Sequence, residues 1–312
     1  MRILVVGAGA LGGYFGGRLV EAGRDVTFFV RPGRAEQIAR HGLRIESPHG
    51  NVEVRPRTVL AGGLAGPYDL ILLAVKAYAL GAAMNDLAPA VGADTTVLPV
   101  LNGMRHLDAL AARFSPGRIL GGVARIPGTL GPEGQVRHIG RDHDLTFGEV
   151  TGSMSERVRA IAALCAGVGF DARAGERIMQ EMWGKWVMLS ALAAMTCMMR
   201  ANVGDILAGP GGREAMLAAF AETRAVAAAA GHEPRPAVMD AALGVLKEGS
   251  PLTASMLRDI EGGSPAEGEH VLGDMVERAE RMDVPTPFLR LARLHLAAYE
   301  ARRAREREQA AQ

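Results

Sequence analysis

Three glycines near the start of the chain have a spacing that could bind phosphate groups. The stretch Gly7-Ala-Gly-Ala-Leu-Gly12 follows a short apolar run, Ile3 to Val6, and precedes residues with helical spacing, 10–22. In such a turn the first glycine allows a tight bend and the second lets the backbone approach a pyrophosphate. The third lets the helix pack closely on the strand. The sequence therefore predicts a dinucleotide cradle made of Gly7, Gly9, Ala10, Leu11 and Gly12.

The second predicted strand, residues 25–31, ends in an arginine rather than a carboxylate. A site that prefers NAD places Asp or Glu there to accept from the ribose hydroxyls, but Asp25 lies at the opposite end of this strand. A guanidinium can pair in a bidentate fashion with a 2′-phosphate, which a carboxylate would repel. We therefore expect NADP(H) as the cofactor, with Arg31 on the 2′-phosphate and Arg34 as support. The alternative for both is a solvated loop arginine.

Lys76 and Asn102 each follow an apolar strand, in Asp69-Leu-Ile-Leu-Leu-Ala-Val-Lys76 and in Leu98-Pro-Val-Leu-Asn102. Ligands of open α/β sheets bind at the carboxyl ends of the strands. Lys76 also precedes a helix, whose dipole disfavours a cation, so a cofactor phosphate or a substrate carboxylate would compensate its charge. The Asn102 amide could hold the nicotinamide ribose, the carboxamide or a substrate oxygen. The alternatives are a lysine that extends into solvent and an asparagine that caps a helix.

Lys185 lies in a largely apolar helical segment, between Trp183 and Trp186. Only three of the 35 basic residues are lysines, namely Lys76, Lys185 and Lys247. Desolvation lowers the pKa of an amine toward the working pH, which suits a general acid, whereas a guanidinium does not release its proton. The sequence therefore predicts that Lys185 is the proton donor. The alternative is a surface ion pair with Glu181, four residues earlier.

Strands and helices alternate over the first third of the chain, which predicts crossover units and a parallel, doubly wound sheet. Short strands over residues 119–150, separated by Gly and Pro turns, predict an added antiparallel portion of that sheet. From about residue 175 the pattern is helical throughout. We expect a Rossmann-type α/β domain at residues 1–172 and an all-α domain for substrate binding and catalysis at residues 173–312.

The composition of the 312-residue chain argues against several classes of function. A net charge of +1 is too small for general binding to nucleic acid or to a membrane surface. The most apolar segment, residues 186–199, is too short to span a bilayer and predicts a buried core helix. Cys165 and Cys197 lack metal-ligand spacing, so we expect free core thiols, no metal site and a cytoplasmic protein.

Taken together and in this order, these segments resemble the ketopantoate reductases (2-dehydropantoate 2-reductases) over nearly the whole chain. The resemblance rests on residues 7–12, Arg31, Val75-Lys76-Ala77, Leu101-Asn102-Gly103-Met104, Trp183-x-Lys185 and the stretch from Ser255 to Glu269. It implies an NADPH-dependent oxidoreductase that reduces ketopantoate to pantoate, on the route to pantothenate and coenzyme A.

The resemblance also implies roles for particular residues. Lys185 would be the general acid, and Glu267 the carboxylate that binds a substrate hydroxyl. Lys76 and Asn102 would line the site, and Ser255 would contact the substrate carboxylate. Without the resemblance, Glu267 could equally be a first-turn glutamate that compensates a helix dipole.

Three positions depart from the pattern of the family. Leu189, Ala193 and Leu252 stand where the pantoate reductases have asparagines. A buried amide that binds substrate contributes about 1–3 kcal/mol, so these changes lower the expected affinity for ketopantoate. An NADPH-dependent reductase of a more apolar 2-oxo acid is therefore the main alternative, and a non-catalytic NADP(H)-binding regulator is a second. The apolar helices would also suit a homodimer.

Overall fold

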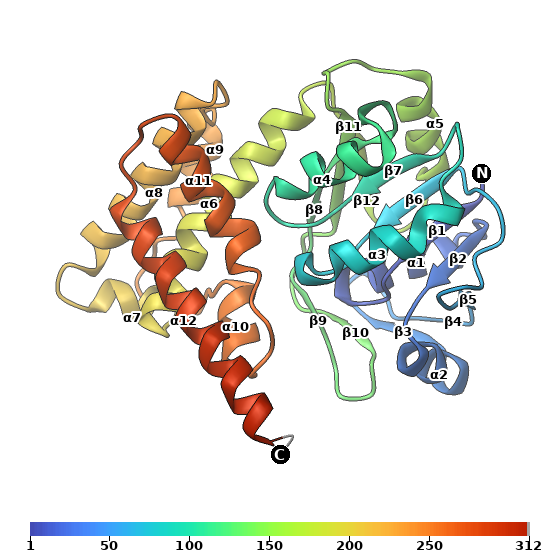
Figure 1. Cartoon of the computed structure of the whole chain (residues 1–312), viewed down its shortest axis with the longest axis horizontal. Helices are drawn as coiled ribbons and strands as arrows, with labels where there is room; N and C mark the ends of the chain where they lie inside the picture. Colours follow the sequence, from blue (N-terminus) through green and yellow to red (C-terminus); the bar gives the residue numbers. More distant parts are fainter. Residues whose placement is uncertain (311–312) are drawn as a thin grey trace. The chain divides into compact units, whose positions relative to one another are not determined.

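The computed structural model describes residues 1–310, which fold into two compact units (Figure 1). The first unit contains residues 1–101 and 106–179, and the second contains residues 102–105 and the chain from residue 180 onward. A short segment after residue 101 therefore belongs to the second unit although most of its sequence neighbours lie in the first. The predicted boundary between residues 172 and 173 stays a prediction.

A five-stranded parallel sheet forms the centre of the first unit, in the order β5-β2-β1-β6-β7. Its strands are β1 (Ile3–Val6), β2 (Val26–Phe29), β5 (Arg57–Val59), β6 (Leu70–Leu73) and β7 (Thr96–Pro99). The residues of β1, β6 and β7 are all buried, as is typical of parallel strands covered on both faces. The helices that follow successive strands include α1 (Ala10–Glu21), α2 (Pro32–His41), α3 (Leu80–Leu87) and α4 (Arg105–Phe114). This confirms the predicted Rossmann-type architecture.

The strands within residues 119–150 pair antiparallel to one another, as predicted, but they do not belong to the parallel sheet. Residues 119–150 instead contribute strands to two smaller sheets. An isolated parallel bridge between Val97 and Ile119 lies just before one of these strands. One small sheet has the order β4-β3-β10-β9, and the other has the order β12-β11-β8. The strands are β3 (Leu43–Glu46), β4 (Val52–Val54), β8 (Leu120–Arg125), β9 (Gly128–Leu130), β10 (Val136–His138), β11 (Asp144–Glu149) and β12 (Asp171–Ala174). The distant pairing of β10 with β3 is parallel, and local alternation of residues cannot specify such a partner.

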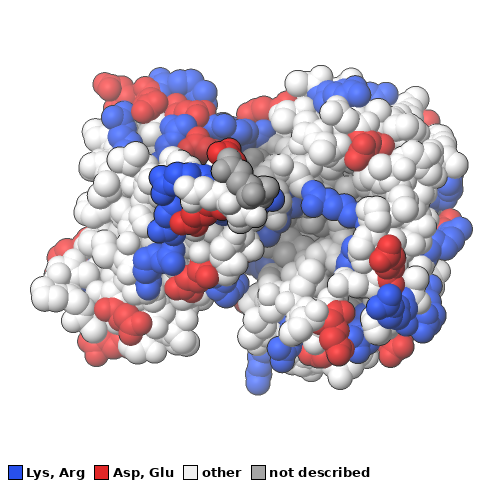
Figure 2. Space-filling view, turned by 60° about the horizontal axis from the view of Figure 1, so that its bottom comes forward, with Lys and Arg blue, Asp and Glu red and all other residues white. Residues whose placement is uncertain are grey.

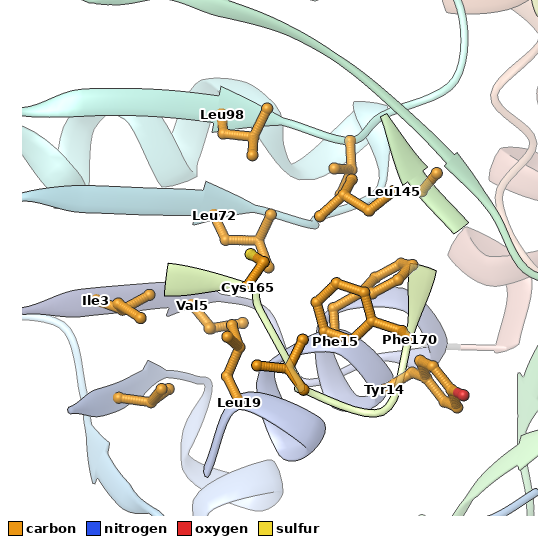
Figure 3. Packing of buried hydrophobic residues seen from close by; sticks show 14 of the residues in the cluster. Ile3, Val5, Tyr14, Phe15, Leu19, Leu72, Leu98, Leu145, Cys165 and Phe170 are labelled. Atoms are coloured by element: carbon orange, nitrogen blue, oxygen red, sulfur yellow. The ribbon is translucent and has the colours of Figure 1, made fainter. Parts of the chain in front are cut away.

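Helix α1 is packed between the parallel sheet and the sheet that contains β3 and β10. Its glycines permit this double contact, since a Cβ at Gly16 would meet the Phe28 ring and one at Gly17 would meet Ile45. Tyr14 and Phe15 of α1 are buried, and Phe15 packs against Phe170, with Cys165 in the same cluster (Figure 3). Both cysteines of the chain are free, and burial raises the pKa of Cys165 to about 11 and that of Cys197 to about 12. The prediction of free core thiols is confirmed.

The second unit is helical, as predicted. Its helices are α6 (Ile178–Met199), α7 (Val203–Ala208), α8 (Gly212–Ala229), α9 (Pro236–Leu243), α10 (Ser255–Glu261), α11 (Asp274–Arg281) and α12 (Pro287–Ala310). Two features escaped sequence analysis. Short α7 and α10 were not predicted, and the segment expected as one helix over residues 265–282 begins with a π-helix, η4 (Glu269–Gly273), before α11 continues it.

Helix α6 is the central helix of this unit. Among the described residues it is the one helix long and apolar enough to cross a membrane, but 72% of its most apolar window is buried inside the protein. This burial fits the predicted core helix. On the face shown in Figure 2, basic and acidic side chains are interspersed over both units, in keeping with the small net charge.

Candidate active site

The glycine loop between β1 and α1 has the backbone of a phosphate cradle. Gly7 has φ +91°, a conformation that favours glycine. A Cβ at Gly12 would lie 2.0 Å from the Gly7 carbonyl oxygen, so only glycine lets α1 begin this close to the loop. At Gly9, by contrast, no protein atom lies within 4 Å of an added Cβ. The space beside Gly9 and the amino end of α1 fit the pyrophosphate of a dinucleotide.

Two arginines follow β2 at the same edge of the sheet. Arg31 is exposed and is the N-cap residue of α2, where the helix dipole disfavours a cation and a bound anion would compensate it. Arg34 is partly buried, and its Nε donates to the Ala8 carbonyl of the glycine loop at 2.9 Å. Its Nη1 donates to the Gly134 carbonyl at 2.7 Å, while Nη2 is buried without a hydrogen-bond partner. Burial lowers the pKa of Arg34. An unpartnered guanidinium nitrogen beside the loop fits an anionic cofactor.

Lys76 follows β6, at the same carboxyl edge of the parallel sheet. It is partly exposed and is the N-cap residue of a short 3-10 helix, η1 (Ala77–Ala79). This is the unfavourable end of a helix for a cation, as the sequence predicted. The role of Lys76 toward a phosphate or carboxylate stays a prediction.

Lys185 and Asn102, 83 residues apart in the sequence, are in direct contact in the second unit. The Lys185 ammonium donates to the Asn102 side-chain oxygen, Oδ1, at 3.0 Å. Glu181, the alternative partner from sequence analysis, accepts from Arg235 at 3.2 Å. Lys185 is partly buried on α6, between the fully buried rings of Trp183 and Trp186. The hydrogen bond to the amide oxygen fixes the direction of the ammonium.

His270 contacts the backbone around Asn102 and was not among the predicted site residues. Its imidazole hydrogen-bonds the Asn102 backbone. Gly103, with φ +78°, lies against it: a Cβ there would be 3.0 Å from the His270 carbonyl oxygen and 3.3 Å from ring atom Cδ2. Burial is the largest effect on the pKa of His270 and lowers it, whereas the carboxylates of Glu267 and Asp274 act in the opposite direction. The sequence feature that could have indicated His270 is its position one helical turn after Glu267.

Glu267 is placed near this group, since its charge acts on His270, and only 7% of its surface is exposed. Ser255 begins α10 and is partly buried. Ala254, just before it, donates its backbone N–H to Thr196 Oγ1 at 3.4 Å. Thr196 lies on α6 eleven residues after Lys185, which corresponds to about 16 Å along the helix axis. The structure thus brings Lys185, Asn102 and His270 together, with Glu267 near His270. The start of α10, where Ser255 lies, is held against Thr196, further along α6.

Apolar side chains lie on α6 between Lys185 and Thr196. Leu189 and Leu192 share the helix face of Lys185 and Thr196 by their spacing. Leu189 is partly exposed, whereas Leu192 and Ala193 are buried. Leu252 is partly exposed and accepts from the Val203 N–H through its carbonyl, at 2.9 Å. None of these side chains can donate to a substrate oxygen. Among the described residues no group of His, Cys, Asp and Glu side chains could hold a metal ion.

Two family models match most of the chain. Residues 3–152 match the model described as ketopantoate reductase PanE/ApbA, and residues 177–300 match the model of its C-terminal region. The uncharacterized oxidoreductase YkpB of Bacillus subtilis (strain 168) is 37% identical over 302 residues, which cover 96% of this chain and 99% of that protein.

Solved structures agree with these matches. The 2-dehydropantoate 2-reductase of Methylococcus capsulatus is 31% identical, with a TM-score of 0.84 over 97% of this chain and 98% of that one. D-mandelate dehydrogenase, solved with NADH and anilino(oxo)acetate, shares the fold at 22% identity, with a TM-score of 0.87 over 97% of this chain and 100% of that one.

Proposed function

The chain belongs to the ketopantoate reductase family of oxidoreductases, and on that premise we propose that it reduces 2-dehydropantoate to pantoate with NADPH. This reaction would place it in pantothenate and coenzyme A biosynthesis, in the cytoplasm. The observation that carries the proposal is the contact of Lys185 Nζ with Asn102 Oδ1 at 3.0 Å. It holds an ammonium in a fixed direction on a mostly buried helix, which is what proton donation to a developing alkoxide requires.

The residues of the first unit would bind the cofactor. Gly7, Gly9 and Gly12 shape the loop for the pyrophosphate, and the buried Arg34 Nη2 favours an anion beside it. Arg31 would pair with the 2′-phosphate, since a guanidinium matches phosphate geometry. NADPH, when bound, supplies the hydride for the ketone carbon.

The residues of the second unit would bind the substrate and transfer the proton. Lys185 would donate its proton to the oxygen of the reacting ketone, and its positive charge would stabilise the alkoxide as it forms. Glu267 would accept a hydrogen bond from a substrate hydroxyl, and Ser255 would donate to the substrate carboxylate. Asn102 would hold the lysine in the donating orientation.

A more apolar 2-oxo acid is a second candidate substrate. Leu189 and Ala193 on α6, with Leu252, offer apolar surface where hydroxyl recognition would need donors and acceptors. A protein of the same fold, D-mandelate dehydrogenase, binds anilino(oxo)acetate, a 2-oxo acid with an aromatic substituent. Loss of amide contacts of about 1–3 kcal/mol each would shift preference between such substrates by about tenfold or more.

Steady-state oxidation of NADPH, followed with a panel of 2-oxo acids, tests the proposal. The panel contains 2-dehydropantoate, phenylglyoxylate and 4-methyl-2-oxopentanoate, each also assayed with NADH. The highest kcat/KM for 2-dehydropantoate supports the proposed substrate, and a higher value for either apolar acid supports the second candidate. NADPH binding without turnover of any acid would contradict both and indicate a binding protein.

A further inference from the structure

His270 lies against the backbone of Gly103 and of Asn102, whose side chain accepts from the proposed proton donor. Asn102 and Gly103 form the end of the segment after β7, and the His270 carbonyl and ring edge lie against the Gly103 Cα. The imidazole also hydrogen-bonds the Asn102 backbone, and this bond raises the pKa of His270. A bond that favours the protonated ring must run from a ring N–H to an acceptor, so the acceptor is the Asn102 carbonyl. His270 therefore fixes the backbone of the residue whose side chain receives Lys185.

A second contact ties the same part of η4 to α6. Trp186, the residue after Lys185, donates its indole N–H to the Val271 carbonyl at 3.1 Å. The contacts thus close a ring: Lys185 binds Asn102, Asn102 binds His270, and Val271 binds Trp186. The closure lies at a π-helix, a geometry that is rare and is found mostly as a single turn at functional sites.

The imidazole suits this position because it supplies a hydrogen-bond donor without adding charge. Burial lowers the pKa of His270, and the Arg105 charge lowers it further, while Glu267 and Asp274 raise it. With the ring neutral, its single N–H is committed to the Asn102 carbonyl, which also fixes its tautomer. A lysine or arginine here would instead place a second cation close to the Lys185 ammonium.

We propose that His270 is a positioning residue for proton transfer: it fixes the Asn102–Gly103 backbone so that Asn102 Oδ1 keeps the Lys185 ammonium in its donating orientation. The inference rests on the proposed function of Lys185. Because His270 acts through Asn102, its loss lowers kcat and leaves substrate binding nearly unchanged.

Steady-state kinetics of three variants test the proposal. His270→Phe keeps a ring against Gly103 but removes the N–H, and displacement of a catalytic group by about 1 Å can cost about 100-fold. We expect its kcat to fall about 30- to 100-fold, with the KM of the accepted 2-oxo acid changed by less than about threefold. The amides of His270→Asn and His270→Gln stand near the two ring nitrogens, and the one that reaches the Asn102 carbonyl restores kcat to within about fivefold.

The control is His232→Phe, which also replaces a ring in the second unit. His232 stacks on Trp183 at 5.6 Å, and burial likewise lowers its pKa. We expect this variant to retain kcat within about twofold, because His232 makes no contact with the Asn102 backbone that the replacement of imidazole by phenyl would remove. Equal kcat in His270→Phe and wild type overturns the inference, as does a low kcat that neither amide restores. If His270→Phe does not fold, His270→Asn and His270→Gln are compared with each other. Equal kcat values in these two variants overturn the inference, because only the amide that reaches the Asn102 carbonyl should restore kcat.

A second measurement separates this inference from the proposed function. Lysine labelled with ¹³C at Cε gives three signals, since the chain has only Lys76, Lys185 and Lys247. The variants Lys76→Arg and Lys247→Arg assign them. His270→Phe should shift the Lys185 signal in the same direction as Asn102→Ala and leave the other two unchanged. An enzyme that turns over no 2-oxo acid contradicts the proposed function, whereas an unshifted Lys185 signal contradicts the role of His270.

Discussion

The amine at residue 185 stands in surroundings that an arginine could not use for the same chemistry. Its neighbours on α6 are two buried tryptophans, and its ammonium donates to the Asn102 amide oxygen at 3.0 Å. The chain uses arginine at almost every other basic position, so a lysine here fits the proposed role as proton donor.

Substitution of Lys185 separates proton donation from charge stabilisation. We expect Lys185→Ala to lower kcat by at least about 1,000-fold, since general acid catalysis contributes about 10²–10⁴ and the ammonium also stabilises the alkoxide. Lys185→Arg should be nearly as slow, because a guanidinium keeps its proton. NADPH affinity, measured by fluorescence titration, should change by less than about threefold in both variants. Near-normal turnover of Lys185→Arg would rule out the proton-donor role.

Arg31 and Arg34 should set the preference for NADPH over NADH. Removing a guanidinium that pairs with a phosphate loses a charge-assisted hydrogen bond of about 1.5–3 kcal/mol, so Arg31→Ala should weaken NADPH binding about 10- to 100-fold. Affinity for NADH should hardly change. Arg34→Ala should weaken both cofactors, since Arg34 also donates to the Ala8 carbonyl of the glycine loop.

The matched control for these arginine variants is Arg57→Ala. Arg57 is an exposed arginine that pairs with Asp25 at the opposite end of the strands. Titration of the four proteins with each cofactor measures the effect. Unchanged NADPH affinity in both Arg31→Ala and Arg34→Ala would remove the basis for NADP specificity.

Among the elements, the loop from Gly7 to Gly12 allows a clean separation of folding from cofactor binding. A Cβ at Gly9 meets no protein atom, whereas one at Gly12 would lie 2.0 Å from the Gly7 oxygen. Gly9→Ala should therefore fold with an unfolding midpoint close to wild type but bind NADPH at least about tenfold more weakly, because the methyl occupies the space expected for the pyrophosphate. Gly12→Ala should lower the unfolding midpoint itself. Thermal unfolding and NADPH titration distinguish these outcomes, and normal NADPH affinity in Gly9→Ala would contradict the cradle.

Three histidines link the β3–β4 hairpin to β10 and the loop after it. The rings of His49 and His143 stack at 3.7 Å, and those of His49 and His138 stack at 5.6 Å. Tyr14 Oη bonds His143 Nδ1 at 2.9 Å, and Ser47 Oγ bonds His138 Nδ1 at 2.9 Å. Burial lowers the pKa of His138 and of His143, and the charges of His49 and Arg18 act in the same direction, while Asp171 and Asp144 oppose them at His143. The stack therefore favours the neutral forms of His138 and His143.

The stability of the first unit should fall in mild acid. The two folded-state pKa values lie below the ordinary value of 6.5, so the unfolded chain binds more protons between that value and the folded pKa. Stability from these groups is complete above pH of about 6.5 and is lost as the pH falls toward the folded-state pKa. Urea unfolding at pH 7.5 and 5.5 measures this loss. The loss of stability between these two pH values should be smaller in His49→Gln than in wild type. It should equal the wild-type loss in His41→Gln, whose side chain is exposed at the end of α2. Equal losses in all three proteins would show that the stack does not contribute.

At the scale of the whole molecule, the assembly of the protein stays a prediction. Helix α12 exposes Leu291 and Leu294, with 58% and 64% of their surfaces accessible, three residues apart on one face. Exposed leucines side by side are typical of a contact surface. We expect a homodimer in light scattering, and we expect Leu291→Asp with Leu294→Asp to yield a folded monomer. A dimer of unchanged stability in the double variant would place the interface elsewhere.

Local sequence determined the parts of this protein that depend on neighbouring residues. The strand–glycine–helix start, the buried strands of the parallel sheet and the change to a helical second half follow from apolar spacing and turn residues, which act within a few residues. The cofactor edge could be predicted as well, because the carboxyl ends of parallel strands share one side of the sheet. The choice of Glu267 came from family resemblance rather than from spacing.

Only the tertiary structure decided which distant groups meet. No local pattern places Asn102 on Lys185, pairs β10 with β3, or closes the π-helix against Trp186. Sequence analysis could not predict a role for His270 for the same reason. A single histidine on a helix indicates no function until the fold brings Gly103 and the Asn102 carbonyl to it. Periodicity specifies which face of an element is buried. Contacts between elements depend instead on packing, which costs conformational entropy of the chain and is stabilised only by the complete core.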